Sequence, residues 1–380
     1  MREVTVFSGG DSKKLSTWSN IPYFFTQTLE KHNIKVNRVD IGPNRVLKLV
    51  WTMSAGWIYK LILGRKTTYV YFRSFTNYLH LRSVIKRALR TYHKSDVNIF
   101  LTFSFSSVGL SQTPVILFGD WTYDHHFKYF AERPPDFMER RSIRREDVNI
   151  ESASLVLPLF PRVAEYMKSR YKNQHIYYLG NVINSTQEDD ESGILRIKRQ
   201  SQSIVFIGSS RYAEGARSLI QAFQELKKEY PMLELDLIGM SKDHFELPLP
   251  GGVLCHGYLD KGKTGERNRY YQLIRKARIL VNTTPKWGAF SSALEAMYHY
   301  TPVMVAPYSE FVETFGREID FGFYSSNEAG DIIQRLRDVF LDPMYESLCI
   351  RAHRAAEKHT WDAYISKMLR KIEEIGINTV

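Results

Sequence analysis

At 380 residues the chain is long enough for two ordinary domains, and its 43% apolar content supports two hydrophobic cores and excludes a disordered chain. Two cysteines occur, Cys255 and Cys349, and their spacing predicts neither a disulfide framework nor a cysteine metal site. The net charge of +11 lies in the first half, because residues 1–183 hold 27 Lys and Arg against 14 Asp and Glu, whereas residues 184–380 hold 25 against 27.

The first half alternates strand-length runs with helical patterns. It opens on a strand-like run, so we expect no signal peptide and a cytoplasmic location. Helical periodicity predicts helices over 21–33 and 81–94. Runs rich in β-branched and aromatic residues predict strands at 2–7, 34–41, 67–72, 97–103, 114–120, 154–160 and 175–180. This alternation predicts a parallel sheet with helices on both faces.

Residues 45–94 contain eleven Lys and Arg and no Asp or Glu. Within them lies the most apolar window of the chain, 46–63, but the eleven residues between Lys48 and Lys60 are too few to span a bilayer. One interpretation is a solvated basic surface, and another is contact with an anionic lipid surface or nucleic acid. For any exposed part we expect peripheral contact with an anionic membrane, through Trp51, Trp57, Leu61, Ile62, Lys60, Arg65 and Lys66.

The strand predicted at 114–120 ends in an ionisable cluster. Asp120 closes the run, and Asp124, His125 and His126 follow it. A carboxylate at this edge can act as a general base on an acceptor hydroxyl, although Asp120 can equally cap a turn. The two histidines are adjacent and point apart on a helix or strand, which makes them a poor metal pair. We therefore expect chemistry that needs no metal.

A polar, acidic stretch at 184–193 predicts the domain boundary. We place an N-terminal domain at 1–183, a linker at 184–200 and a second domain at 201–360. A C-terminal helix at 361–380 packs on either domain. The second half alternates again, with strands predicted at 203–208, 233–239, 253–259, 278–284 and 302–307 and helices at 216–231, 270–277 and 291–300. The expected fold is α/β, with two Rossmann-like domains.

Two strand-to-helix turns of the second half suit a phosphate. One strand ends at Gly208, before a helix that begins near Gly215. The strand at 278–284 leads through Lys286 and Gly288 into the helix predicted at 291–300. A helix terminus contributes only about 0.3–1 kcal/mol towards an anion. A diphosphate therefore also needs a fixed cation, for which Arg211 and Lys286 are the candidates.

The second turn reads WGAFSSALEAM, residues 287–297, and holds one acid, Glu295. Ser291 or Ser292 fits a helix N-cap with Glu295 as its capping-box acid. The small residues before the helix also leave room for a ligand to approach backbone amides. Both interpretations stay open on the residues alone.

The second half resembles the donor domain of GT-B glycosyltransferases, closest to family 4, the glycosyl transferases group 1. The likeness covers 204–345 through GARSLIQAF, LELDLIG, HGYLD, YQLIRKARILVNTT and LEAMYHYTPVMVA. The first half is similar in VFSGGDSKKLSTWSNIPYFFTQTLE and SLVLPLFPRVAEYMKSRY. The resemblance implies a GT-B architecture, with two Rossmann-like domains whose parallel sheets face a central cleft.

The resemblance also implies roles for single residues. Glu295 falls on the glutamate that holds the nucleotide ribose, whereas Trp287 stands where relatives place a second glutamate near the donor sugar. Ser209 and Glu214 occupy the places of the family's phosphate-binding Arg and Lys. We therefore expect Arg211, two residues beyond Ser209, to contact the donor phosphates in place of that arginine. The other donor-side candidates are Gly208, Gly257, Tyr258, Lys286, Gly288, Phe290, Ser291 and Ser292. The acceptor-side candidates are Gly9, Gly10, Trp18 and His125, with Asp120 nearest the family's active-site histidine.

The expected function is transfer of a sugar from a nucleotide-sugar donor to a glycan or lipid-linked saccharide, in surface polysaccharide or glycoconjugate synthesis. We expect the transfer to be retaining and metal-independent, with no cofactor besides the nucleotide-diphosphate sugar as substrate. One alternative is a GT-B protein that has lost catalysis and binds glycan. The other is a basic nucleic-acid-binding protein, for which the sequence offers no recognised motif.

Overall fold

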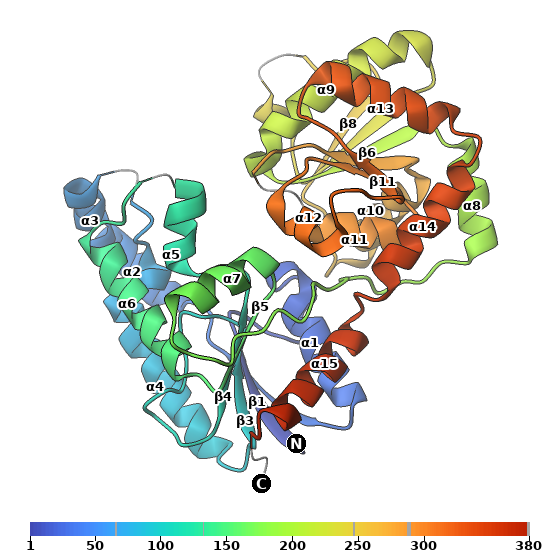
Figure 1. Ribbon diagram of the computed structural model, residues 1–380. Helices are drawn as coiled ribbons and strands as arrows, with labels where there is room; N and C mark the ends of the chain where they lie inside the picture. The colour runs from blue at the N-terminus through green and yellow to red at the C-terminus, as the bar shows by residue number, and fades with distance from the viewer. Residues whose placement is uncertain (65–66, 132, 246–247, 287–289, 378–380) are drawn as a thin grey trace. The chain divides into compact units, whose positions relative to one another are not determined.

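The computed structural model describes residues 1–64, 67–131, 133–245, 248–286 and 290–377. The chain forms two compact units, and both are drawn in Figure 1. Unit 1 comprises Met1–Gly180 and Tyr364–Val380, and unit 2 comprises Asn181–Ala363. Residues 184–200, which we expected to form a linker, belong to unit 2, where Ile194 and Lys198 of the helix α8 (Glu191–Gln200) are buried.

Unit 1 is built on a five-stranded parallel sheet with the order β2-β1-β3-β4-β5. Its strands are short and mostly buried, as expected for a sheet covered on both faces. Their bounds are β1 Glu3–Ser8, β2 Lys35–Asp40, β3 Val97–Phe100, β4 Val115–Gly119 and β5 Leu155–Pro158.

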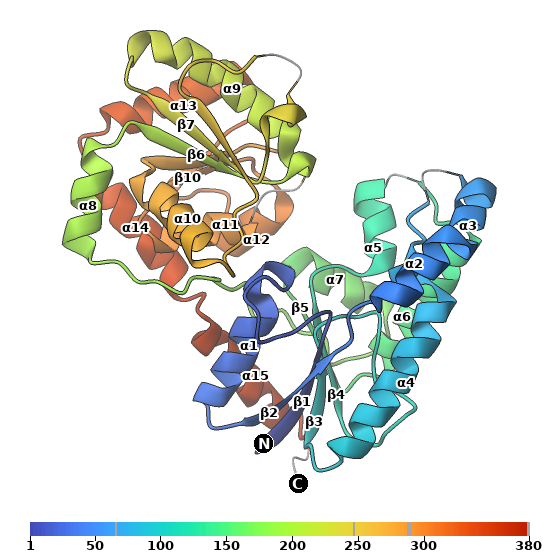
Figure 2. The same cartoon turned by 180° about the vertical axis from the view of Figure 1, so that it is seen from behind.

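Helices cover both faces of this sheet (Figures 1 and 2). On one face α4 (Phe75–Thr91), α6 (Phe137–Ser152) and α7 (Pro161–Arg170) pack on Phe7 and Phe100. On the other, Phe118 contacts Phe25 of α1 (Ile21–Lys31) and Tyr364 of α15 (Trp361–Glu374). The shorter helices are η1 Trp18–Asn20, η2 Tyr71–Arg73, α5 Tyr123–His126 and η3 Phe127–Ala131.

Unit 2 is built on a six-stranded parallel sheet with the order β11-β10-β9-β6-β7-β8. Its strands are β6 Ser203–Ile207, β7 Glu234–Ile238, β8 Val253–Gly257, β9 Ile279–Asn282, β10 Val303–Val305 and β11 Gly322–Tyr324. Figure 1 shows α9 and α13 on one side of the sheet and α10, α11 and α12 on the other. The helices are α9 Ala213–Glu229, α10 Thr264–Lys276, α11 Phe290–Tyr298, α12 Ser309–Phe315, α13 Ala329–Leu341 and α14 Tyr345–Glu357, with η4 Ser210–Tyr212 and η5 Lys242–His244.

One predicted strand is wrong. Residues 67–72 lead into the helical turn η2 instead, because Tyr69 and Tyr71 are buried in an aromatic cluster with Trp51 rather than in a sheet. Residues 175–180 make a single bridge, between Ile176 and Val156.

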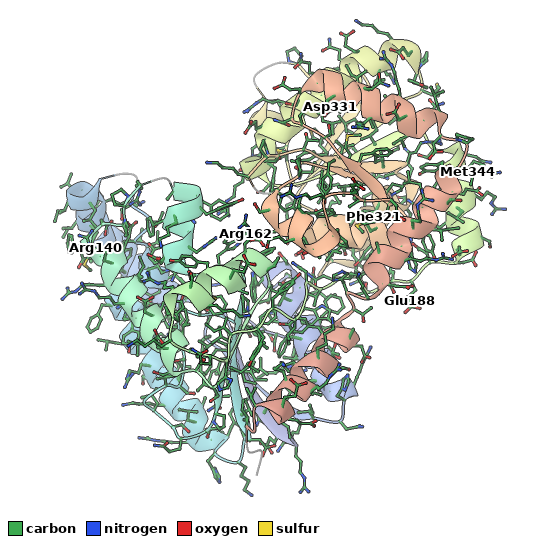
Figure 3. The ribbon with its side chains drawn as sticks, in the orientation of Figure 1. Arg140, Arg162, Glu188, Phe321, Asp331 and Met344 are labelled. Atoms are coloured by element: carbon green, nitrogen blue, oxygen red, sulfur yellow. The ribbon has the colours of Figure 1, made fainter. Side chains whose placement is uncertain are left out.

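The acid-free stretch begins with two short helices, α2 (Arg45–Met53) and α3 (Ala55–Leu63). No single described helix is long and apolar enough to cross a membrane; α2 and α3 reach that length and apolar composition only when counted together, across a bend of 49°. Figure 3 shows the side chains around them, including the exposed Arg140 of α6.

Candidate active site

The backbone segments that follow β6 and β7 lie close together at the carboxyl edge of the unit 2 sheet. The amide of Gly208 donates to the carbonyl oxygen of Ile238 (2.9 Å). A Cβ atom on Gly239 would lie 2.5 Å from the carbonyl oxygen of Gly208, and Gly239 has a φ of +97°. Glycine at position 239 therefore allows the two segments to meet at the edge where open α/β sheets bind ligands.

Glu295 is buried on α11, and its carboxylate is the centre of a polar cluster. Lys261, in the segment before α10, donates from Nζ to Oε1 (2.5 Å) and Oε2 (2.7 Å). The hydroxyl of Tyr270 donates to Oε2 (2.8 Å). The hydroxyl of Tyr271 lies 3.3 Å from both Oε1 and the carbonyl oxygen of Asn184, so its single proton is shared between them.

These contacts nearly saturate the Glu295 carboxylate. An ionised carboxylate offers about four lone-pair positions, of which three are taken and the fourth is taken in part. Burial, followed by the charge of Glu295, raises the pKa of both tyrosines, which keeps their hydroxyls protonated as donors. Because α11 begins at Phe290, ahead of both serines, Glu295 is an internal residue of that helix rather than its capping-box acid.

The remaining donor-side candidates fall into two groups. Ser209, Arg211, Lys286 and Tyr258 are exposed, and Gly257 has a φ of +63° with open space where a Cβ would stand. Phe290 is buried against Phe311 and Phe315, so its ring packs in the core, while Ser291 and Ser292 are half-buried in the first turn of α11. Trp287 and Gly288 lie outside the described residues.

In unit 1, Asp120 lines a pocket of about 320 Å³ at the carboxyl edge of the sheet. The pocket brings Asp120 together with two acceptor-side candidates, Gly9 and Trp18, and with Arg73 from η2. Its other lining residues are Ile41, Phe72, Leu101, Thr102, Phe103, Ser104, Phe105, Gly119 and Trp121.

Burial raises the pKa of Asp120, and this effect outweighs both the hydrogen bond from the amide of Trp121 and the charge of Arg73. A raised pKa makes this carboxyl group a better proton acceptor. Arg73 is itself held by Ser104 Oγ (2.7 Å) and by the buried Glu146 (2.9 Å). The site thus contains a basic carboxylate beside a fixed guanidinium.

Trp18 reaches this pocket from a strained segment. Trp18, Ser19 and Asn20 have φ values of 36°, 53° and 71°, a left-handed run of three residues that are not glycine. Such strain costs about 1–3 kcal/mol per residue and often marks functional sites. Gly10 has a φ of +130°, and no atom of the described residues lies within 4 Å of the position that a Cβ on Gly9 would take. The backbone at residues 18–20 therefore places Trp18 at the edge of the pocket, and the space beside Gly9 stays open.

His125 does not line this pocket. It is buried on α5 with its ring stacked on Trp121 (4.8 Å), and neither ring nitrogen has a hydrogen-bond partner among the described residues. Burial lowers the pKa of His125 to about 4, so the ring is neutral at physiological pH. His125 therefore contributes to the pocket only through its packing against the lining residue Trp121.

Sequence reasoning missed Lys261 and Arg73. Lys261 lies 34 positions before its partner Glu295, and an isolated loop lysine carries no local signal. Arg73 is one of eleven basic residues in the acid-free stretch, and nothing in the sequence distinguishes it from the others. Within the described ranges, no group of three or more His, Cys, Asp or Glu side chains is arranged to hold a metal ion.

Comparison with known sequences gives a match to part of unit 2. A sequence-family model described as Glycosyl transferases group 1 matches residues 201–342, a range that contains Gly208, Lys261 and Glu295. No curated protein matches the sequence significantly.

Solved structures share the fold over almost the whole chain. A sucrose-phosphate synthase from Thermosynechococcus elongatus superimposes with a TM-score of 0.70 at 14% identity, covering 99% of each chain. HepE from Anabaena, in complex with UDP and glucose, gives 0.58 at 16% identity over 97% of this chain and 99% of its own. A Listeria monocytogenes protein described as a UDP-N-acetylglucosamine 2-epimerase gives 0.62 at 12% identity over 98% and 96%. The fold of the chain is that of the GT-B glycosyltransferases.

Proposed function

We propose that this chain is a glycosyltransferase that moves a sugar from a nucleotide-sugar donor to a glycan or lipid-linked saccharide, which the match of residues 201–342 to the glycosyl transferases group 1 model supports. In this proposal the donor lies on the carboxyl edge of the unit 2 sheet, over the segments that follow β6 and β7, with Glu295 of α11 as its ribose partner. The acceptor hydroxyl enters the unit 1 pocket. The observation that carries the proposal is that pocket, because it sets the Asp120 carboxyl beside Arg73.

On the acceptor side, Asp120 and Arg73 hold the acceptor sugar in the pocket, with Arg73 fixing one of its oxygens. We propose retention, which the family resemblance implies, so the attacking hydroxyl gives its proton to the leaving diphosphate while Asp120 orients the sugar. Inversion, with Asp120 as the general base, is the alternative, and the anomeric configuration of the product distinguishes the two. Arg211 and Lys286, rather than a divalent metal, neutralise the leaving diphosphate.

On the donor side, Glu295 accepts hydrogen bonds from the ribose hydroxyls. Lys261 occupies two of its lone-pair positions, so a ribose needs the lysine to shift, and its long, unbranched side chain is the most mobile of the three partners. A displaced ammonium remains close to the nucleotide, where it adds positive charge for the diphosphate. HepE, whose structure holds UDP, supports a uridine nucleotide as the first choice.

A thermal-shift screen with UDP, GDP, dTDP, CMP and their sugars tests the donor proposal. One nucleotide should raise the melting temperature. At 100 times its Kd, a ligand that binds only the folded chain adds about 2.7 kcal/mol to the free energy of unfolding. Glu295→Gln should abolish that increase, whereas Glu328→Gln, at an exposed position of unit 2, should keep it. If no nucleotide stabilises the wild type, the proposal fails. Steeply salt-dependent binding to nucleic acid would then favour the basic nucleic-acid-binding alternative.

We further propose that α2 and α3 dock on an anionic membrane at its cytoplasmic face. Trp51 anchors the two helices to unit 1, and Gly56 lies against its ring, where a Cβ would come within 2.7 Å. The outer face presents large apolar side chains to solvent: Val46, Leu49, Val50, Met53, Trp57, Ile58, Leu61 and Ile62. A contiguous apolar surface of this kind marks an interaction site.

The charges around this surface fit a lipid headgroup layer. Arg45, Lys48 and Lys60 are exposed on the same two helices, which contain no acid. Trp51, which we expected on the membrane surface, is buried instead, whereas Trp57 (65% exposed) and Leu61 (71%), expected there as well, are exposed. Arg65 and Lys66 lie outside the described residues. Such a contact suits an enzyme that acts on a lipid-linked saccharide.

Sedimentation with vesicles tests this contact. The protein should bind phosphatidylcholine vesicles that contain phosphatidylglycerol, and Trp57→Ser/Leu61→Ser should lose that binding. Met232→Ser/Leu341→Ser removes two comparably exposed apolar side chains from unit 2 and should bind as the wild type does. Equal binding by all three proteins, or binding by none, would exclude α2 and α3 as the membrane contact.

A further inference from the structure

The chain passes between its two units in two segments, which are bonded to each other inside unit 2. The first connecting segment, residues 181–190, leads into unit 2, and the second, residues 358–363, leads out of it. Nε1 of Trp361 in the second segment donates to Oδ1 of Asn184 in the first (2.9 Å), and this contact is buried. A change in the position of the first segment therefore also affects the second.

The buried side chain of Tyr271, on α10, lies between the first connecting segment and Glu295. Its hydroxyl accepts a hydrogen bond from the amide of Thr186 (3.2 Å). The same hydroxyl lies 3.3 Å from the carbonyl oxygen of Asn184 and 3.3 Å from Oε1 of Glu295. A hydroxyl has a single proton, so these two acceptors share it, and both distances exceed the usual value of about 2.7–2.8 Å. A stronger bond to Glu295 must weaken the bond to Asn184.

The rest of the first connecting segment is held by polar side chains of the same part of unit 2. His299, directly after α11, is hydrogen-bonded through Nε2 to Ser185 Oγ (3.0 Å) and through Nδ1 to Asp189 Oδ2 (2.7 Å). Arg275 of α10 donates from Nε to Asp189 Oδ1 (2.5 Å). These contacts keep the segment beside Tyr271, so that a small movement of the Tyr271 hydroxyl makes or breaks its bonds to the segment.

A donor nucleotide on Glu295 shifts the balance between the two acceptors. In the free protein the Lys261 ammonium lies 2.5 and 2.7 Å from the carboxylate oxygens and offsets their charge. The proposed ribose contact displaces that ammonium and puts neutral hydroxyls in its place. A carboxylate without its counter-ion is a stronger hydrogen-bond acceptor than a backbone carbonyl. The Tyr271 proton is then donated to Glu295, and the hydroxyl moves away from the connecting segment.

We propose that Tyr271 is a positioning residue that couples Glu295 to the first connecting segment, so that donor binding releases residues 184–186 from α10. The inference rests on the proposed function, because the donor nucleotide is the ligand that displaces Lys261. Coupling between two sites is reciprocal, so the attached segment in turn disfavours donor binding. The segment that joins the two units is thus held in the free protein and released when the donor site is filled.

Hydrogen–deuterium exchange of the full chain tests this coupling, with the amide of Thr186 as the main reporter. The free protein is compared with the protein saturated with UDP, GDP, dTDP or CMP in turn. A nucleotide that binds should speed exchange over residues 184–187 by about 2- to 10-fold, which corresponds to the loss of one neutral hydrogen bond. Because a bound ligand ordinarily stabilises the folded chain, faster exchange in this segment distinguishes the coupling from simple binding.

Tyr271→Phe removes the hydroxyl and keeps the ring. The free variant should exchange over 184–187 as fast as the nucleotide-bound wild type, because its segment is already released. It should still bind the nucleotide through the intact Glu295, and binding should cause no further increase in exchange. A tyrosine with a purely structural role would speed exchange in the free variant but leave the effect of the nucleotide in place.

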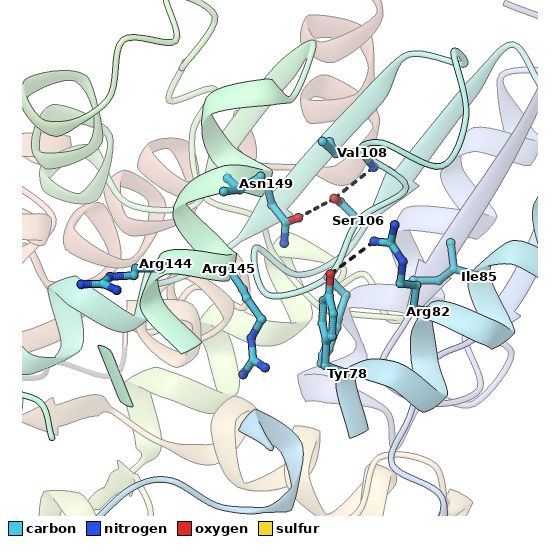
Figure 4. Close-up of a pocket in the computed structure, with 10 residues that line it drawn as sticks. Tyr78, Arg82, Ile85, Ser106, Val108, Arg144, Arg145 and Asn149 are labelled. Atoms are coloured by element: carbon cyan, nitrogen blue, oxygen red, sulfur yellow. Dashed lines mark hydrogen bonds between the residues drawn. The ribbon is translucent and has the colours of Figure 1, made fainter. Parts of the chain in front are cut away.

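Tyr78→Phe is the matched control. Tyr78 lines a pocket of unit 1 between α4 and α6, where its hydroxyl accepts a hydrogen bond from Nη1 of Arg82 (3.3 Å), as Figure 4 shows. This variant also loses one hydroxyl and keeps the ring, but the change lies in unit 1, whereas Glu295 and the first connecting segment belong to unit 2. The nucleotide should therefore speed exchange over 184–187 as it does in the wild type.

Three results would overturn the inference. If a nucleotide binds the wild type without speeding exchange over 184–187, the coupling is absent while the donor proposal stands, and this result needs no variant. If the nucleotide speeds exchange equally in the wild type and in Tyr271→Phe, shown to be folded by circular dichroism, then Tyr271 is not the link. If none of the four nucleotides binds the wild type, the donor proposal and this inference fail together.

Discussion

Lys261 and Glu295 form a bidentate ion pair inside unit 2, with the lysine Nζ 2.5 and 2.7 Å from the two carboxylate oxygens. Both side chains are largely buried, with 13% and 4% of their surface exposed. Removing one partner of a buried pair leaves the other charge uncompensated, at a cost of about 3–5 kcal/mol. The hydroxyls of Tyr270 and Tyr271 solvate the carboxylate but cannot neutralise it.

We therefore predict that Lys261→Met lowers the free energy of unfolding by about 3 kcal/mol. The double variant Lys261→Met/Glu295→Gln should lose less than the sum of the two single changes, since both charges are then absent. Urea unfolding of the four proteins gives the coupling energy. Lys263→Met, at an exposed position paired with Glu266, should change the free energy of unfolding little, because solvent screens this pair. A coupling energy near zero would mean that the pair does not form.

Asp120 should be required for turnover but not for donor binding. Asp120→Asn keeps the shape of the side chain and removes its charge, so we expect kcat to fall, by about 10²–10⁴-fold if Asp120 is the general base of the inverting alternative, with the affinity for the nucleotide unchanged. The raised pKa of Asp120 also predicts that wild-type activity falls on acidification at a higher pH than for an exposed aspartate, because the ionised form is lost earlier. Initial rates across pH test this. Unchanged kcat in Asp120→Asn would remove it from the reaction.

His125 should make the protein sensitive to mild acid. Burial depresses its folded pKa to about 4, below the ordinary value of 6.5, so the unfolded chain binds the proton more readily than the native one. Stability is therefore full above the unfolded pKa and is lost as the pH falls towards the folded pKa. Between about pH 7 and about pH 5 this group alone should lower the free energy of unfolding by about 2 kcal/mol.

His125→Phe supplies the control for that prediction. Phenylalanine keeps an aromatic ring against Trp121 but does not titrate, so the variant should lose about 2 kcal/mol less than the wild type over the same pH interval. Chemical denaturation at both pH values gives the comparison. Identical pH dependence in the two proteins would assign the acid sensitivity to other groups.

Gly215 should be needed for the packing of α9 on the end of β9. A Cβ at this position would lie 2.4 Å from Oγ1 and 3.0 Å from the amide nitrogen of Thr284. Gly215→Ala should therefore cost about 1–3 kcal/mol through overpacking. Gly330→Ala, on α13 with nothing within 4 Å, should instead be neutral or stabilise by up to about 1 kcal/mol. Thermal denaturation of the two variants compares them, and equal effects would contradict the close approach.

The sheet of unit 2 could be predicted largely from the sequence, because most of its strands are apolar runs bounded by Gly, Pro or polar residues. The short strand β11 was missed, since three residues, Gly322–Tyr324, carry too little pattern. The opposite error at residues 67–72 has a tertiary cause. Tyr69 and Tyr71 alternate as in a strand, but they are buried against Trp51 from a different helix.

Residues of the candidate site that belong to a local sequence motif could be predicted. Residues that reach the site from distant parts of the chain could not. Glu295 follows from its helix and from the family resemblance, and Asp120 follows from the end of its strand. The partners that set their chemistry, Lys261 and Arg73, come from segments whose positions only the folded chain determines.

The chain returns to unit 1 in its last long helix, and this has a consequence for biosynthesis. Tyr364, Ile365, Met368 and Ile372 of α15 are buried, and Tyr364 covers Phe118 on the sheet of unit 1. A ribosome makes all of Asn181–Ala363 before it reaches them, which takes about 10–40 s at ordinary rates. During that time the nascent first unit exposes an uncovered apolar strip. Its folding is therefore completed after translation of the second unit, and chaperones that bind apolar surface have a defined interval in which to act.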